Sequence, residues 1–349
     1  MSSQWLAHLA AAGAKIKSTD TGEIEAFAEL QTEAKFVLSG NCICPLSHYG
    51  VIQVTGSDAQ AFLQGQTSND ITEVSDTHGQ LNSYSHPKGR VLALFRLLKQ
   101  DKRYLMVLPR EILSATINRL RMFVMRSDVQ LEDVSEQVMI IGASGEHIST
   151  LLPAWPGKMD AVACSDSLIV TQIPGSHTRA LILGDSETMI NLWDALQGKA
   201  TPVGHNVWHR LDIQAGLPEI YTSSMESFIP QMINLDLLGA INFKKGCYPG
   251  QEIVARMHYL GNLKKRMYAV EFSSELAPKI GEKIYTSAGE SNQSSGNLLR
   301  FAVNGENTYC GLAVIQIAAI DTGNEIYIES NRQNALKITT LPYSLEKAN

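Results

Sequence analysis

The chain has 349 residues and a formal net charge of -6, enough length for two or three domains with sizeable cores. Hydrophobic residues make up 44% and charged residues 18%, a balance that excludes extensive disorder. The acidic balance argues against wholesale binding to nucleic-acid phosphates, which needs clustered Lys and Arg. A local basic patch is still compatible with it, because several basic residues lie close together in sequence: Lys244, Lys245, Arg256, Lys264, Lys265 and Arg266.

The Ala-rich start, residues 5–14, resembles the apolar core of a secretory leader. It lacks preceding positive charges, and Lys15 and Lys17 follow it instead. The longest apolar run, residues 312–320, is interrupted by Gln316 and is well short of the roughly 20 residues that a membrane span needs. We therefore expect a small amphipathic helix at the start, no membrane segment and a cytoplasmic location.

Hydrophobic periodicity predicts both strands and helices along the first 215 residues. Strands are predicted at 51–55, 80–85, 90–98, 103–108, 138–141, 168–173 and 179–183. Helices are predicted at 111–126, 186–197 and 207–215. A further helix is expected after Ser57, because Ser57-Asp58-Ala59-Gln60 has the pattern of a capping box.

The pattern changes in the last third of the chain. Residues 221–242 are irregular, and from residue 262 short β-type runs alternate with Gly, Asn and Ser turns. The runs are 266–272, 283–286, 311–318 and 325–329. They predict a separate small β-barrel, interrupted by a mobile polar loop at 287–297. The fold class is therefore α+β.

A candidate functional thiol lies in the segment Phe243-Lys244-Lys245-Gly246-Cys247-Tyr248-Pro249-Gly250-Gln251-Glu252. Gly246 and Gly250 suit tight or left-handed backbone, and Pro249 fixes φ, so the segment before Gln251 is predicted to be a turn. A helix is predicted from Gln251 onward. Exposed amides, a helix dipole and neighbouring lysines favour the reactive thiolate form of a cysteine placed in this way.

The five cysteines do not form a disulfide framework, because they are scattered and odd in number. Cys42 and Cys44 are the one close pair. Either they form a metal or redox site, or they are two thiols in a loop before a strand. The second interpretation is preferred, because no Cys or His pair at metal-ligand spacing accompanies them.

The motif Lys245-Gly246-Cys247-Tyr248-x-Gly250-Gln251-Glu252 resembles the defining motif of the YgfZ family of folate-binding proteins, relatives of the glycine-cleavage aminomethyltransferase. Further similar segments are Gln64-Gly65-Gln66-Thr67, Lys88-Gly89-Arg90, Phe228-Ile229-Pro230-Gln231, Asn234-Leu235 and Leu341-Pro342-Tyr343-Ser344-Leu345-Glu346. The resemblance therefore spans nearly the whole chain.

The resemblance implies a three-domain ring around a cavity that takes tetrahydrofolate or a derivative. The implied parts are a folate-binding core (1–135 and 200–261), a ferredoxin-like α/β unit (136–199) and a C-terminal β-barrel (262–349). It implies an accessory role toward iron–sulfur enzymes or assembly proteins, with an indirect link to tRNA thiolation. A one-carbon transferase or demethylase with an unidentified substrate is the alternative, and a direct tRNA-binding module is the third.

The resemblance also implies which residues contact folate. Tyr49, where the family usually has Trp, and Trp208 occupy aromatic positions suited to stacking on a pterin or aminobenzoyl ring. Both are otherwise core residues. Gln231 and Asn234 are candidate hydrogen-bonding groups for the ligand, with bonding to the loop backbone as the alternative.

Two departures from the aminomethyltransferase argue against aminomethyl transfer. Gln214 stands where the transferase has the acidic residue that holds the pterin, so a charge-assisted pair is lost and weaker pterin binding is expected. The segment Arg90-Val91-Leu92-Ala93-Leu94 lacks the carboxylate that the transferase carries in the corresponding strand. A classical enzyme activity is therefore not expected.

The motif side chains have competing interpretations. Cys247 is a nucleophile, a ligand of a shared cluster or a redox sensor, or else a small buried hydrophobe. Lys245 binds a glutamate-tail carboxylate or a phosphate, or is a solvated surface lysine. Glu252 orients a folate amine or caps the helix, and an ion pair with Arg256 accounts for both residues structurally.

The remaining histidines give weaker signals. His86, in the turn before Lys88-Gly89-Arg90, is a candidate acid–base group but is more readily explained as a solvent-exposed turn residue. His205 and His209 have the i,i+4 spacing of a zinc helix. They lack the intervening Glu and an evident third ligand, so no metal site is predicted.

Overall fold

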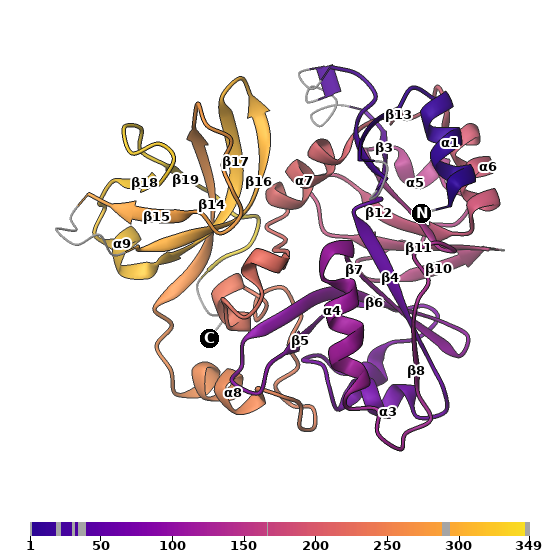
Figure 1. Cartoon of the computed structure of the whole chain (residues 1–349), viewed down its shortest axis with the longest axis horizontal. Coiled ribbons are helices and arrows are strands. Elements are labelled where there is room, and N and C mark those ends of the chain that lie inside the picture. The colour runs from indigo at the N-terminus through magenta and orange to yellow at the C-terminus, as the bar shows by residue number, and fades with distance from the viewer. Residues whose placement is uncertain are drawn as a thin grey trace. The chain divides into compact units, whose positions relative to one another are not determined.

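The structure of the chain is a computed structural model that describes residues 2–18, 22–29, 32–33, 40–165, 167–287 and 294–345 (Figure 1). Its internal contacts divide the chain into two compact units. Unit 1 contains Met1–Gly65, Asp70–Asn82 and Phe95–Trp208. Unit 2 contains Gln66–Asn69, Ser83–Leu94 and His209–Asn349. Each unit therefore combines segments that are distant in sequence.

A six-stranded sheet in unit 1 combines strands from distant parts of the sequence. Its order is β10 (Val162–Ser165), β11 (Leu168–Ile173), β12 (Arg179–Gly184), β9 (Met139–Ser144), β3 (Cys42–Pro45) and β13 (Thr201–Pro202). Neighbouring strands are antiparallel except β3 and β13, which are parallel. A hairpin of β1 (Lys15–Ser18) and β2 (Glu23–Ala26) forms a separate two-stranded sheet.

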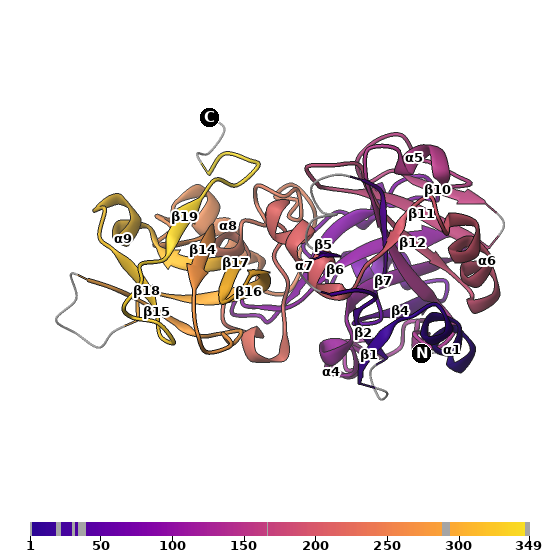
Figure 2. The same ribbon diagram turned by 90° about the horizontal axis from the view of Figure 1, so that it is seen from above.

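The helices of this region share a hydrophobic core with the sheet. Helices α1 (Ser3–Ala11) and α6 (Ser186–Leu196) lie side by side in two perpendicular views (Figure 1, Figure 2). Trp5 and Trp193 meet edge to face in this core, with ring centroids 5.8 Å apart. Helix α6 begins where predicted, because the Asp185 side chain accepts a hydrogen bond from the Thr188 amide. The short α5 (Ile148–Leu151) completes this group.

A five-stranded sheet has the order β5 (Gln80–Ser85), β6 (Val91–Gln100), β7 (Arg103–Pro109), β4 (Tyr49–Thr55) and β8 (Gln130–Asp133). Helix α4 (Arg110–Arg121) packs on β4, β7 and β8. It buries one face at helical spacing: Ile112, Leu113, Thr116, Ile117 and Leu120. The predicted helical spacing is thus confirmed up to Leu120, but the helix ends five residues before the predicted end at 126, and Phe123 of the predicted segment is 41% exposed.

The predicted capping box at Ser57 is wrong. Helix α3 (Ala59–Gln64) has Asp58 as its N-cap, and that side chain does not cap the helix. The amide and hydroxyl of Ser57 both donate to the Asp128 carboxylate, at 2.9 Å. The Ser57 hydroxyl, which the local sequence pattern assigned to capping the helix, therefore bonds to a residue far away in sequence. A short 3-10 turn, η1 (Ile71–Glu73), follows α3.

Irregular backbone dominates between residues 215 and 250, which includes the irregular region predicted at 221–242. Helix α7 (His205–Gln214) begins two residues before its predicted start and ends before the Ala215-Gly216 turn. Two 3-10 turns follow, η2 (Thr222–Ser224) and η3 (Pro230–Ile233). Helix α8 (Gln251–Tyr259) then starts at Gln251, which confirms the helix predicted there. No helix in the described part of the chain is long and apolar enough to cross a membrane.

The C-terminal region is a six-stranded antiparallel sheet, drawn in orange and yellow in Figure 1, that curls into a half-barrel. Its order is β18 (Ile326–Ile328), β15 (Lys283–Thr286), β16 (Gly296–Gly305), β17 (Thr308–Gln316), β14 (Lys265–Ser273) and β19 (Lys337–Thr339). Helix α9 (Ile317–Asp321) follows β17. Strand β16 was not predicted, and residues 288–293 of the predicted mobile loop lie outside the described residues.

The structure confirms the α+β class and the change to β structure near residue 262. The predicted strands at 80–85, 168–173 and 283–286 have the observed bounds of β5, β11 and β15. The three-domain assignment stays a prediction.

Candidate functional site

The turn that carries the cysteine is built on Gly250. This residue has φ +83° and precedes α8, which confirms the left-handed backbone predicted for it. A Cβ on Gly250 would lie 2.7 Å from both the Gly89 Cα and the His86 carbonyl oxygen. Gly89 itself has φ +72°, and its own Cβ would meet Ile253 at 2.8 Å. The Lys88-Gly89-Arg90 turn therefore packs directly on the cysteine turn.

The other glycine of the motif has no such requirement. Gly246 lies outside the left-handed region, and a Cβ built on it meets nothing within 4 Å. Left-handed backbone at this position, one of the two conformations expected, is therefore absent.

Lys245 is buried under this turn, with 8% of its surface exposed. Its Nζ donates to the carbonyl oxygens of Thr67, at 2.7 Å, and Asn69, at 2.8 Å. The ammonium also lies 5.3 Å from the centre of the Tyr248 ring. The interpretation of Lys245 as a solvated surface residue is wrong, because its charge is used to join two loops of unit 2. Burial raises the pKa of Tyr248 to about 12.

Cys247 is exposed at the outside of the same turn. Its interpretation as a buried hydrophobe is therefore wrong. Glu252 and Arg256 are also exposed. Within the described part of the chain, these two side chains do not form the ion pair that their spacing suggested. Gln251 fixes the turn instead, since its amide group donates to the carbonyls of Lys245, at 3.4 Å, and Gly246, at 3.5 Å. The thiol thus lies on a turn that the side chains of Lys245 and Gln251 hold in place.

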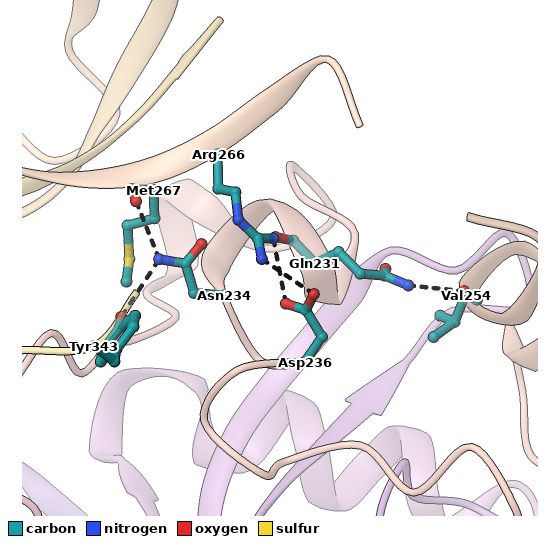
Figure 3. A network of polar contacts seen from close by, with 7 residues as sticks. All are labelled: Gln231, Asn234, Asp236, Val254, Arg266, Met267 and Tyr343. Carbon is teal, nitrogen blue, oxygen red and sulfur yellow. Dashed lines mark hydrogen bonds and ion pairs between the residues drawn. The ribbon is translucent and has the colours of Figure 1, made fainter. Parts of the chain in front are cut away.

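Gln231 and Asn234 lie in a buried network in unit 2 (Figure 3). Nε2 of Gln231 donates to the Val254 carbonyl of α8 at 2.7 Å. Nδ2 of Asn234, a residue with φ +61°, donates to the Met267 carbonyl of β14 at 3.0 Å. The amide nitrogens therefore hold loop and strand backbone. The amide oxygens of both side chains are buried and find no donor among the described residues.

An ion pair adjoins these two side chains. Arg266 and Asp236 expose 8% and 7% of their side chains, and two guanidinium–carboxylate contacts of 3.3 and 3.2 Å join them (Figure 3). The guanidinium also donates to the Gln231 carbonyl at 2.9 Å. Removing one partner of such a pair destabilises the fold, because the other charge would remain buried and unpaired. Sequence reasoning placed Arg266 in a basic patch and missed this role.

Tyr343 ties the C-terminal segment to two loops of unit 2. Its hydroxyl donates to the Gly216 carbonyl at 2.7 Å and accepts from Nδ2 of Asn234 at 3.3 Å. Burial raises its pKa to about 12. Gly216 has φ +65°, and a Cβ there would lie 2.6 Å from the Tyr343 ring. The Ala215-Gly216 turn is therefore held by a residue far away in sequence, whereas Gln214 beside it is exposed.

A second buried ion cluster lies beyond this turn and was missed by sequence reasoning. Arg300 of β16 contacts the carboxylates of Asp212, at 3.3 Å, and Glu219, at 3.4 Å. Tyr221 donates its hydroxyl to Glu219. Burial, with the Glu219 charge next in effect, raises the pKa of Tyr221 well above its usual value. The carboxylates nearest to Gln214 in sequence are thus paired with an arginine.

The two candidate aromatic residues belong to unit 1. Trp208 is 1% exposed, with the Arg179 guanidinium carbon 4.2 Å from its ring centre. A Cβ on Gly142 would lie 2.4 Å from the same indole. Tyr49 is half-buried at the start of β4, its ring 4.3 Å from that of His48. In this structure the neighbours of Trp208 are those of a core residue.

The other candidates have structural roles. Cys42 and Cys44 are buried within β3 and not in a loop before a strand, so that part of the expectation is wrong. Burial raises the pKa of the Cys42 thiol to about 11, which fits the non-functional interpretation. Nδ1 of His86 accepts from the Lys88 amide at 3.1 Å. His205 contacts the Glu23 carboxylate at 3.1 Å. Among the residues that the structure describes, no group of three His, Cys, Asp or Glu side chains is placed to hold a metal.

Comparisons with known proteins agree with the cysteine motif. No family model matches the chain. It is 29% identical over 308 residues to the tRNA-modifying protein YgfZ of Escherichia fergusonii, covering 86% of this chain and 93% of that one. Proteins of the same name from Klebsiella pneumoniae and Colwellia psychrerythraea are 28% and 27% identical, covering 87% and 86% of this chain and 93% and 92% of theirs. The chain is a homologue of the YgfZ proteins.

The fold is shared more widely than the YgfZ sequence. The crystal structure of the glycine cleavage system aminomethyltransferase T from Bartonella henselae matches 98% of this chain and 97% of its own, with a TM-score of 0.80 and 15% identity. The aminomethyltransferase-like fold predicted from the motif is therefore confirmed. The YgfZ motif, Gln231 and Asn234 all lie in unit 2, and Tyr49 and Trp208 lie in unit 1. Their joint role as one site stays a prediction.

Proposed function

We propose that this protein binds a tetrahydrofolate and supports proteins that carry iron–sulfur clusters, and through them the thiolation of tRNA. The observation that carries the proposal is the exposed thiol of Cys247 on a turn that buried groups hold rigid. The homology to proteins named tRNA-modifying protein YgfZ and the fold of an aminomethyltransferase support it.

The polar chemistry of unit 2 fits a pterin. The edge of a pterin carries N–H donors, and the buried amide oxygens of Gln231 and Asn234 are acceptors without a donor in the described chain. The exposed amide of Gln214 supplies a further acceptor. Trp208 fits less well, because a ligand stacks on it only when the Arg179 guanidinium moves away. In unit 1, the half-buried Tyr49 is the more accessible ring.

Titration of 5-formyltetrahydrofolate by calorimetry tests the ligand. We expect binding by the wild type and at least tenfold weaker binding by Tyr49→Leu. Tyr285→Leu is the control, since Tyr285 is a partly exposed ring on β15 of the C-terminal sheet. Absence of binding by the wild type would overturn the folate assignment.

If Cys247 is a ligand of an iron–sulfur cluster, one chain does not supply enough cysteine ligands for that cluster. Iron–sulfur clusters generally take about four ligands, and Cys247 is joined in unit 2 by one other cysteine, Cys310, which is half-buried on β17. A cluster at Cys247 is therefore shared with a partner. Cells that carry only Cys247→Ala should lose activity of iron–sulfur enzymes, whereas Cys164→Ala, at the other exposed cysteine, should retain it. Normal activity with Cys247→Ala would contradict the proposal.

One-carbon transfer is the second candidate, because the fold is that of an aminomethyltransferase. The strand that would supply the carboxylate has Val91, Leu92, Ala93 and Leu94, all of them buried and apolar. Turnover of a methylated or formylated folate by the purified protein would favour this candidate over the accessory role.

A further inference from the structure

The two chain segments that meet at the cysteine turn are rich in basic residues, although the protein is acidic. The segment that pairs with Val91 adds one exposed carboxylate, Glu226. Residues 86–90 and 243–265 contain seven Lys and Arg and a single acidic residue, Glu252, whereas the whole chain has a net charge of -6. Five of the seven are exposed: Lys88, Arg90, Lys244, Arg256 and Lys264. The contact of Gly89 with Gly250 brings the first two beside the cysteine turn. These exposed basic residues are called here the basic rim.

The same surface exposes apolar side chains. Four large hydrophobic residues are exposed in the described part of unit 2, and three of them are on or next to α8. They are Ile253, 37% exposed, Tyr259, 65% exposed, and Leu260, 86% exposed. Exposed apolar groups that gather beside a polar rim mark interaction sites more often than singly scattered ones do.

An aromatic cluster holds this apolar surface in place. The rings of Phe243 and His258 stack with centroids 3.8 Å apart, and Tyr259 meets the His258 ring edge to face at 4.7 Å. The end of α8 is thereby fastened to the segment that leads into the cysteine turn. Tyr259 and Leu260 thus stay exposed on an ordered helix end.

We propose that the basic rim and the apolar end of α8 dock an acidic segment of a partner protein, with an apolar side chain of the partner on Tyr259 and Leu260. The partner's carboxylates would face the rim, and its docked segment would pass the Cys247 thiol. This inference rests on the proposed function, since the partner is the cluster-carrying protein that the thiol serves. Phosphates of an RNA would satisfy the rim but leave Leu260 and Ile253 uncovered, so the apolar groups favour a protein.

Thiol–disulfide exchange at Cys247 tests the docking. The probe is a twelve-residue peptide of Glu and Leu whose one cysteine carries 5-thio-2-nitrobenzoate as a mixed disulfide. The Cys247 thiolate attacks the peptide sulfur, a protein–peptide disulfide forms, the old disulfide breaks, and thionitrobenzoate leaves with the electron pair. The thiol proton passes to buffer. Release is followed by absorbance in a Cys164→Ser background and normalised to a small neutral disulfide of the same type, which removes changes in intrinsic thiol reactivity.

The acidic peptide should react at least tenfold faster than its counterpart with Lys in place of Glu, and 0.5 M salt should narrow the difference. Arg256→Glu and Lys244→Glu should each slow it about threefold or more, whereas Lys279→Glu, the same charge change on the connection before β15, should not. Leu260→Ser should remove the advantage of the Leu peptide over a Ser peptide. Leu276→Ser is its control, because Leu276 is 67% exposed elsewhere in unit 2.

Equal rates for the acidic and basic peptides would overturn the proposal, as would rates that these variants leave unchanged. Inhibition by micromolar bulk tRNA but not by a cysteine-free acidic peptide would assign the surface to RNA. Dimerisation in sedimentation that Leu260→Ser abolishes would assign it to a second copy of the chain. The exchange assay contains no folate. A negative result in it therefore does not affect the folate proposal, and a failure to bind folate does not affect the docking proposal.

Discussion

Gly89 and Gly250 pack against each other with left-handed backbone on both sides, so closely that a Cβ on Gly250 would fall 2.7 Å from the Gly89 Cα. The contact joins a turn of the first hundred residues to the turn that carries Cys247. The thiol is therefore positioned by backbone packing as well as by its own loop, and side chains at either glycine would displace it.

Gly250→Ala should destabilise the protein by about 2–4 kcal/mol, because alanine is strained at φ +83° and its Cβ meets backbone that cannot yield. Urea unfolding followed by circular dichroism measures the loss. Gly246→Ala is the matched control, since a Cβ at Gly246 meets nothing within 4 Å, and its unfolding free energy should change by less than about 0.5 kcal/mol. Equal effects of the two substitutions would contradict this account of the turn.

Lys245→Met should also destabilise the protein, by about 2–3 kcal/mol, because the carbonyls of Thr67 and Asn69 lose a charged donor while they remain buried. Lys244→Met, at the exposed neighbouring lysine, should have little effect on the free energy of unfolding. The same urea experiment compares them. A stable Lys245→Met protein that has lost folate binding would instead show that this lysine serves the ligand.

Exposed and buried thiols should differ in their reactivity toward 5,5'-dithiobis(2-nitrobenzoate). Cys164 and Cys247 are exposed and should react in the folded protein. Cys42 and Cys44 are buried in β3, where burial raises the pKa of Cys42 to about 11, and should react only after unfolding. Stopped-flow absorbance counts the fast thiols, and Cys247→Ser should remove one. A fast phase unchanged in Cys247→Ser would show that the cysteine turn is closed in solution.

Local sequence predicts much of this fold because local patterns decide it. The helix after Gly250 follows from a Gly-rich turn and is observed at the predicted residue. Lys245 was not predictable as a buried group, since its acceptors are 178 and 176 residues away. Ser57 likewise follows a local capping pattern yet bonds to Asp128, 71 residues on.

Strand β16 escaped prediction for a related reason. Arg300 interrupts its apolar pattern with a charge that reads as exposed, but the side chain is buried against Asp212, 88 residues before it. The candidate site shows the same limit. The motif identified the exposed thiol, whereas the residues that hold the loops of unit 2, Arg266, Asp236 and Tyr343, are recognisable only through contacts between distant segments.

Two tyrosines should make the protein less stable in strong alkali. Burial raises the pKa of both Tyr248 and Tyr343 from 10 to about 12 in the folded chain. The unfolded chain releases these protons first, so their stabilising effect is complete below pH 10 and is lost as the pH rises toward 12.

Tyr343→Phe separates the two contributions. It removes the hydroxyl that donates to Gly216 and accepts from Asn234, which should cost about 1–2 kcal/mol at pH 7. The variant should also lose less stability than the wild type between pH 9 and about 11, because the raised pKa of Tyr343 is gone. Urea unfolding across this pH range measures both effects. Tyr285→Phe, at a partly exposed ring of the same C-terminal region, is the control and should follow the wild type. Parallel pH profiles for Tyr343→Phe and the wild type would show that the Tyr343 hydroxyl is not protected from solvent in the folded protein.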